Sequence, residues 1–175
     1  MSFSYETKNE LCRLPVQKLC CARAEAYGIL LYCNTFSATE VRVITENPNF
    51  AERLPKLFRR AFGLSFDRQP DKEQIEGKRI FQITDPRKLN HIINVLGYDP
   101  QQNLVLHINF AFMEEACDQA AFLRGAFFAG GSITDPQKRY HLELTTSHLQ
   151  VSREIESLLV ECGYPPKSLS RNGSS

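Results

Sequence analysis

Residues that could ligate a metal or act as nucleophiles are scattered along this chain. The four histidines have neither i,i+4 spacing nor the Cys/His spacing of a ligand set. They are His91, His107, His141 and His148. The six cysteines contain no C-x-x-C pair, so reduced, partly buried thiols are favoured over a zinc site or a disulfide framework. They are Cys12, Cys20, Cys21, Cys33, Cys117 and Cys162. With no glycine-rich phosphate loop and no G-x-S-x-G, the sequence predicts no cofactor and no small-molecule substrate.

Charge and hydropathy narrow the class of protein further. Among 175 residues, 42% are apolar, enough for a core, and 21 Lys and Arg against 20 Asp and Glu give a net charge of +1. No overall field attracts nucleic acid, so any such binding must be local. The longest apolar run, about 120–133, contains Arg124 and is shorter than the roughly 20 residues that cross a bilayer. The N-terminus has no secretory pattern. We therefore expect a cytoplasmic protein that does not enter a membrane.

The first half reads as alternating helices and strands. Expected helices cover 5–14, 18–32, 48–62 and 86–96, and expected strands cover 41–45, 64–68 and 79–84. Asn47–Pro48 and Asp85–Pro86 are helix starts, because Asn or Asp caps free amides and Pro fits the first turn. Gly63 and Gly97 are helix stops. Pro55 is expected to kink or interrupt its helix. Residues 1–16 form a separate helical arm that ends at Pro15.

The same order of elements begins again in the second half. A helix over 113–130, a strand over 140–145 and a helix over 149–162 are expected, and residues 117–133 align with 21–37 at an offset of 96. The shared order indicates an internal duplication, with one repeat in 17–111 and another in 112–175. After Pro165 there is room for only one strand, about 167–171. The second repeat is therefore expected to be incomplete. We expect the chain to be a shortened form of a longer protein; the alternative is that its second half borrows a closing element from elsewhere.

Small residues one turn apart mark two of the expected helices. Such spacing lets two helix backbones approach closely. The pairs are Ala24 with Gly28, Gly125 with Ala129, and Ala126 with Gly130. We expect helix 17–33 to pack against helix 114–131 through these residues. The alternative is that small residues are simply common in buried helices.

These motifs resemble a known family. Residues 123–131, LRGAFFAGG, resemble the signature of LAGLIDADG homing endonucleases. The segments ETKNEL (6–11), CCARAE (20–25), FLRGAFFAGGSITDP (122–136) and YHLE (140–143) are similar to the N-terminal region of the bacterial WhiA regulators. The resemblance implies an α+β fold, a duplicated LAGLIDADG homing-endonuclease-like αββαββα repeat with the second repeat incomplete. It also implies a C-terminal helix-turn-helix domain that is absent from this chain.

The resemblance predicts loss of catalysis. In homing endonucleases the eighth signature position carries an acid that holds the catalytic metals. That position falls on Gly130 and, at the offset of 96, on Asn34. An amide and a hydrogen cannot replace two carboxylates on Mg²⁺. We therefore expect no catalytic residue, no metal there and no enzyme. A degenerate or metal-rescued nuclease and a pure protein-interaction scaffold are the alternatives.

The resemblance also implies a function and a binding surface. WhiA proteins act in transcription control linked to cell division, chromosome segregation or sporulation, which implies a nucleoid-associated protein. Double-stranded DNA would be bound mainly through the absent domain, with protein partners besides. DNA lies on the sheet in homing endonucleases, so cations on strands or strand ends are the candidate contacts. They are Arg42, Arg68, Lys78, Arg79, Arg139 and Arg171.

Overall fold

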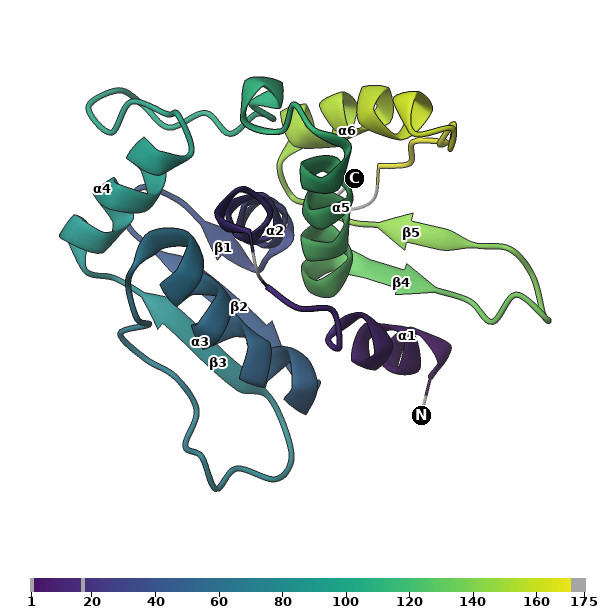
Figure 1. Ribbon diagram of the computed structural model, residues 1–175, viewed down its shortest axis with the longest axis horizontal. Helices are drawn as coiled ribbons and strands as arrows, with labels where there is room; N and C mark the ends of the chain where they lie inside the picture. The colour runs from purple at the N-terminus through teal and green to yellow at the C-terminus, as the bar shows by residue number, and fades with distance from the viewer. Residues whose placement is uncertain (1, 17, 171–175) are drawn as a thin grey trace.

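The computed structural model describes residues 2–16 and 18–170, which form six α-helices, one short 3-10 helix and five strands (Figure 1). In chain order these are α1 (Phe3–Leu11), α2 (Leu19–Tyr32), β1 (Thr35–Phe36), β2 (Val41–Thr45), α3 (Pro48–Phe62), β3 (Arg79–Ile83), α4 (Pro86–Val95), η1 (Phe110–Phe112), α5 (Ala116–Gly130), β4 (Gly131–Ile133), β5 (Leu142–Leu144) and α6 (Leu149–Glu161). The fold is α+β, as the sequence predicted.

Local signals explain where α3 begins and ends. The Asn47 side-chain oxygen accepts hydrogen bonds from the backbone amides of Asn49 and Phe50, and Gly63 ends the helix with φ of 69°. A positive φ is readily available only to glycine. The helix continues through Pro55, which therefore does not interrupt it, and the alternative of a kink there stays a prediction. Its apolar face is buried and the helix packs against α2, and this packing outweighs one lost backbone hydrogen bond.

The first repeat folds around a three-stranded antiparallel sheet in the order β1-β2-β3. Val41 pairs with Ile83 and Val43 with Phe81, and these four side chains are buried in the core. In Figure 1, α3 lies over one face of this sheet. The alternate residues, such as Arg42, are turned toward the other face, because successive side chains of a strand point to opposite sides. The sheet therefore has a helix-covered face and an outer face.

Two expected strands are not formed. In segment 64–68 only Arg68 makes an isolated antiparallel bridge, to Gln82. Residues 167–170 contain no strand, and residue 171 lies outside the described residues. Both segments are short, and strand formation depends on a partner that local sequence does not reveal. The second repeat contributes α5, the antiparallel pair β4-β5, and α6.

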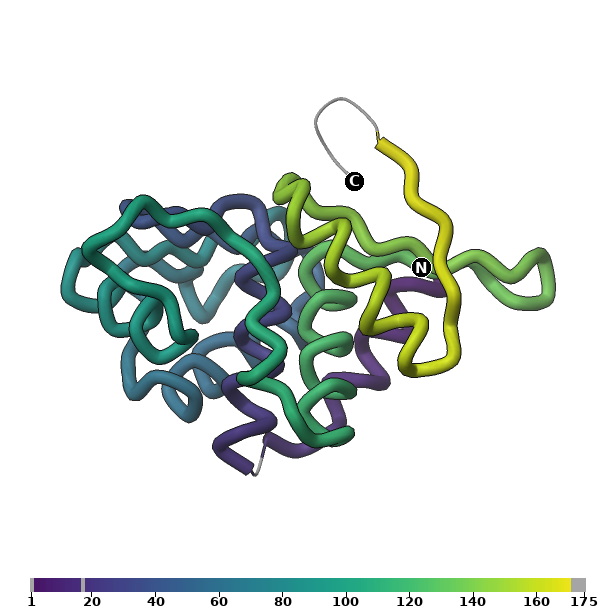
Figure 2. The backbone as a smooth tube through the Cα atoms, turned by 90° about the horizontal axis from the view of Figure 1, so that it is seen from above, coloured from purple at the N-terminus to yellow at the C-terminus, as the bar shows by residue number. Residues whose placement is uncertain are grey.

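The helices α2 and α5 form the centre of the molecule and join the two repeats (Figures 1 and 2). The helix α1 lies across this junction. Ser4 exchanges two hydrogen bonds with the backbone of Ile133 in β4, and Asn9 accepts a hydrogen bond from Asn47 at the start of α3. The N-terminal arm thus contacts both halves instead of projecting from one.

Candidate nucleic-acid interface

The crossing of α2 and α5 depends on two glycines. A Cβ atom added to Gly28 would lie 2.1 Å from the carbonyl oxygen of Phe122, and one added to Gly125 would lie 2.0 Å from the carbonyl oxygen of Glu25. Both distances are far below van der Waals contact, and both involve backbone atoms. The backbones therefore meet at these two positions, where no side chain fits. Ala24 and Ala126 are also fully buried, whereas Ala129 and Gly130 are partly exposed.

These contacts fix how the two repeats correspond. Gly28 and Gly125 are 97 positions apart, and so are their partners Glu25 and Phe122. A two-fold relation between the helices requires one constant spacing, so the structural offset is 97 and not 96. The third signature residue, glycine, is thus Gly125 in α5 and Gly28 in α2. The eighth is Gly130 in α5 but Cys33 in α2, and Asn34 moves to the ninth position.

The carboxyl-terminal ends of these helices offer no metal-binding acid at the signature positions. Cys33 donates its thiol hydrogen to backbone carbonyls, and burial raises the pKa of this thiol to about 12, so it stays uncharged. The Asn34 side-chain oxygen accepts a hydrogen bond from the amide of Ile44 in β2. A Cβ added to Gly130 would lie 2.4 Å from the carbonyl oxygen of Thr145 and 3.1 Å from the Tyr32 ring. An acid at this position would require the backbone to move.

A buried ion network between the helices was not anticipated from the sequence. Glu25 in α2 is fully buried, and both of its oxygens accept hydrogen bonds from Arg53 of α3, at 2.8 Å each. Arg124 of α5 donates its Nε hydrogen to the same carboxylate at 2.5 Å. Arg53 also donates to the carbonyl of Leu14, at the end of the arm. A glutamate inside an apolar helix can be buried only if a positive side chain pairs with it. Glu25 among the small and apolar residues of α2 was therefore the signal in the sequence that could have predicted this network.

One candidate DNA contact has a structural role instead. Arg79 is 6% exposed, and its guanidinium donates hydrogen bonds to carbonyl oxygens of Glu46, Gln74, Ile75 and Gly77. These bonds hold the connection that precedes β3 against the end of β2. These bonds occupy the guanidinium, so Arg79 is left out of the phosphate contacts proposed below.

The remaining candidate cations are more accessible. Arg42 lies on the outer face of the sheet, with its side chain 43% exposed and paired with Glu40 at 3.3 Å. Arg68 and Lys78 are exposed beside β3, and Arg139 is exposed in the connection between β4 and β5. Within residues 2–16 and 18–170, these last three make no ion pair. Arg171 lies outside the described residues. The positive charge that these four side chains could offer to DNA is thus small, and it is divided between the two sheets.

Comparisons with known proteins agree with this geometry. Residues 119–175 match the family model for the WhiA LAGLIDADG-like domain. The probable cell division protein WhiA of Ruminiclostridium cellulolyticum is 33% identical over 181 residues, covering 99% of this chain and 58% of that protein. The corresponding protein of Alkaliphilus metalliredigens is 30% identical over 186 residues, covering 99% and 59%. The chain is thus similar to WhiA proteins over nearly its whole length, and residues 119–175 match their LAGLIDADG-like domain.

Solved structures support the same fold for this chain. The crystal structure of the N-terminal LAGLIDADG domain of DUF199/WhiA matches with a TM-score of 0.71 and 17% identity, over 99% of this chain and 82% of that one. The homing endonuclease I-DmoI, in complex with DNA and Mn, matches with a TM-score of 0.59 and 12% identity, over 90% and 88%. The chain spans somewhat more than half the length of its curated relatives. In its described part, no helix is long and apolar enough to cross a bilayer.

Proposed function

We propose that this chain is the non-catalytic DNA-contacting platform of a WhiA-type transcription regulator that acts in cell division. The observation that carries the proposal is the pair of signature helices that retain their close crossing but end on Cys33 and Gly130 instead of acids. Two-metal phosphodiester hydrolysis needs carboxylates there, and Gly130 has no room for one. The curated relatives named cell division proteins support the biological role.

The DNA surface in this proposal is the outer face of the sheets with its adjoining connections. I-DmoI is similar in fold and was crystallised with DNA, which supports the fold as a platform for a duplex. The proposed phosphate contacts are Arg42, Arg68, Lys78 and Arg139. Few cations act here and Arg42 is already paired with an acid. We therefore expect sequence-independent binding with a Kd on the order of 10⁻⁴ to 10⁻⁶ M, the range for non-specific association.

In this proposal most of the affinity comes from a helix-turn-helix region that the longer relatives would carry beyond the matched segment. The test is a gel-shift and fluorescence-anisotropy comparison of this chain with a version extended by that region from a relative. We expect the extended protein to bind much more tightly and to discriminate between sequences. Equal binding by both proteins would mean that the platform itself reads DNA.

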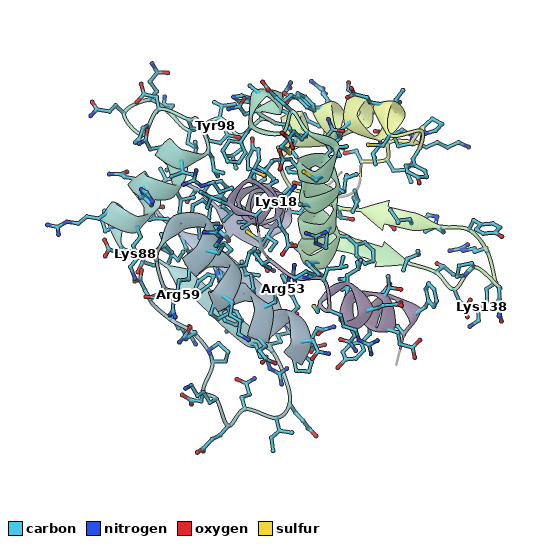
Figure 3. The ribbon with its side chains drawn as sticks, viewed as in Figure 1. Lys18, Arg53, Arg59, Lys88, Tyr98 and Lys138 are labelled. Carbon is cyan, nitrogen blue, oxygen red and sulfur yellow. The ribbon has the colours of Figure 1, made fainter. Side chains whose placement is uncertain are left out.

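A salt titration with matched variants tests the surface. The log of the binding constant should fall linearly with log salt, by about 0.9 for each phosphate neutralised. Replacing Arg68 by Ala should lower this slope by about 1. Arg59→Ala is the control, because Arg59 is also exposed but lies on the solvent side of α3 (Figure 3). No binding at low salt would reject the DNA role and leave a protein-interaction scaffold.

The absence of catalysis has its own assay. Supercoiled plasmid incubated with this chain and Mg²⁺ or Mn²⁺ should remain intact over many hours. Sustained cleavage that disappears when Cys33 or Asn34 is replaced by Ala would refute the non-catalytic assignment. Cleavage that survives both replacements would point to a contaminating nuclease, and a repeat with an independently purified Cys33→Ala protein would decide this.

A further inference from the structure

Three thiols and a carboxylate meet at the end of the central helices that is opposite to the carboxyl-terminal ends discussed above. The Sγ atoms of Cys20, Cys21 and Cys117 and a carboxylate oxygen of Asp118 all lie within 4.8 Å of one another. The Cys21 Sγ lies 3.6 Å from Asp118 Oδ1, and the Cys117 Sγ lies 3.9 Å from the same oxygen. In Figure 2, α2 and α5 begin side by side at this end of the molecule.

The positions of the four residues follow the two-fold relation of the repeats. Cys20 precedes Cys117 by 97 positions, and Cys21 precedes Asp118 by the same number. This is the spacing that relates Gly28 to Gly125 at the helix crossing. Each helix therefore contributes two adjacent side chains from equivalent places in its first turn. Because the crossing glycines bring the backbones into contact, the four side chains converge without a loop having to close over them.

The surroundings of Asp118 are a second observation that indicates a cation, beside the convergence of the four side chains. Asp118 is only 5% exposed. Its carboxylate accepts hydrogen bonds from the thiols of Cys21 and Cys117, which are not cations. Among the described residues, no Lys, Arg or His forms an ion pair with it. The other deeply buried acid, Glu25, is matched by two arginines. A buried carboxylate without a positive partner is costly, and a metal ion bound here would supply that partner.

The donor set selects the kind of metal. Sulfur ligands favour zinc over the hard cations Mg²⁺ and Ca²⁺, which take oxygen ligands. Zinc is bound tetrahedrally with Zn–S distances of about 2.3 Å, which places two sulfurs roughly 3.8 Å apart. Donor atoms that already lie within 4.8 Å need to move by only about 1 Å to reach this geometry. Four protein ligands fill the shell, which is typical of a structural site.

We propose that Cys20, Cys21, Cys117 and Asp118 bind one zinc ion, which clamps the amino-terminal ends of α2 and α5 and so joins the two repeats. The site is separate from the DNA platform and from the former catalytic positions, and it does not depend on the proposed function. Adjacent cysteines and a Cys–Asp pair do not form a recognised zinc spacing. Their convergence is visible only once the repeats are superposed at the offset of 97.

The test is a titration of the reduced, chelator-treated 175-residue chain with Co²⁺ and then Zn²⁺. Cobalt should bind one equivalent and give the sulfur-to-cobalt charge-transfer band and the intense visible bands of a tetrahedral thiolate site, which zinc should then abolish. Zinc should also raise the melting temperature, because a ligand that binds only the folded state stabilises it.

Variants decide whether these residues are the ligands. Cys21→Ser and Cys117→Ser should each weaken cobalt binding by at least about 100-fold, since loss of even an outer-shell partner costs about 10- to 100-fold. Asp118→Asn should retain the charge-transfer band at reduced affinity. Cys12→Ser and Cys162→Ser are the controls, because both cysteines lie outside the cluster. If Cys117→Ser does not fold, as judged by circular dichroism, the Asp118→Asn titration stands in its place.

The outcomes that reject the site are equally definite. A fully reduced wild-type chain that shows no thiolate charge-transfer band does not have this site. Binding that is unchanged in the cluster variants, or that is lost in Cys162→Ser, places the metal elsewhere. A disulfide that forms between Cys21 and Cys117 without metal uptake by the reduced chain would show that the cluster is a redox pair instead.

Discussion

Replacing Gly28 by Ala tests the central claim that α2 and α5 touch through their backbones. Helix propensity alone predicts the opposite effect, since Ala is favoured over Gly inside a helix by about 1 kcal/mol. The added Cβ would lie 2.1 Å from the Phe122 carbonyl oxygen and 2.8 Å from the Ala126 amide nitrogen. Both are backbone atoms, which cannot rotate away. The helices must therefore separate.

The size of the effect follows from that separation. Restoring an ordinary contact moves the axes apart by roughly 1 Å, and a gap of this size forfeits a quarter to a half of each dispersion contact across the interface. Overpacking of a core typically costs about 1–3 kcal/mol, and the strain here falls on rigid backbone in both helices. We therefore take the top of that range, about 3 kcal/mol, which leaves a net loss of about 2 kcal/mol after the propensity gain of about 1 kcal/mol is subtracted.

The assay is urea and thermal unfolding followed by circular dichroism. A loss of 2 kcal/mol should lower the melting temperature by about 4–8 °C for a chain of this length. Gly125→Ala should behave in the same way, because its Cβ would meet the Glu25 carbonyl. Gly163→Ala is the control, because nothing lies within 4 Å of an added Cβ there and only its φ of 91° is strained. An unchanged or raised melting temperature for Gly28→Ala would refute the close crossing.

Other perturbations test separate parts of the structure. Glu25→Ala leaves two partly buried arginines without their carboxylate and should cost about 3–5 kcal/mol in urea unfolding; a loss below about 1 kcal/mol would show that the network relaxes into water. His148 has a pKa lowered by burial, and its Nε2 is buried without a hydrogen bond. The unfolded chain therefore takes up this proton at a higher pH than the folded chain does, so stability should fall as pH drops below the ordinary histidine pKa of 6.5. His148→Gln should flatten this part of the pH–stability curve, and an unaltered curve would assign the effect to another group. Arg79→Ala should lower stability without changing the salt slope of DNA binding, whereas Lys78→Ala should lower that slope by about 1 and leave stability unchanged; the reverse pattern would restore Arg79 as a DNA contact.

Elements with strong local signals were predictable from the sequence. The starts of α3 and α4 were correctly placed because Asn47 and Asp85 cap free amides within their own first turns. The stop at Gly63 was correct because a single residue adopts a positive φ there. Such signals act over three or four residues and need no information about the rest of the fold. The short strand at 64–68 and the one at 167–171 carried no such signal.

The register between the repeats was harder to predict, and the reason is physical. Both central helices carry small or apolar residues at nearly every position, so offsets of 96 and 97 match almost equally well by residue type. Only the contact of Gly28 with Phe122, and of Gly125 with Glu25, separates the two registers. A shift of one residue turns a helix by about 100°. It moved the eighth signature position from Asn34 to Cys33 and hid the correspondence of Cys20 with Cys117.

The two ends of the central helix pair show that a signature motif combines independent physical requirements. Its glycine is required by the approach of two backbones, and this chain retains it in both repeats as Gly28 and Gly125. Its acids are required only for metal-dependent cleavage, and neither Cys33 nor Gly130 supplies one. Selection for packing can therefore keep the helix crossing after the chemistry is lost. Close packing requires small residues only where the two helices cross. The first turns of both helices lie outside the crossing, so their side chains can serve as metal ligands of a different kind. Removing the zinc proposed there should loosen the amino-terminal ends of α2 and α5 and leave the contact at Gly28 intact, which amide exchange along α2 would resolve residue by residue.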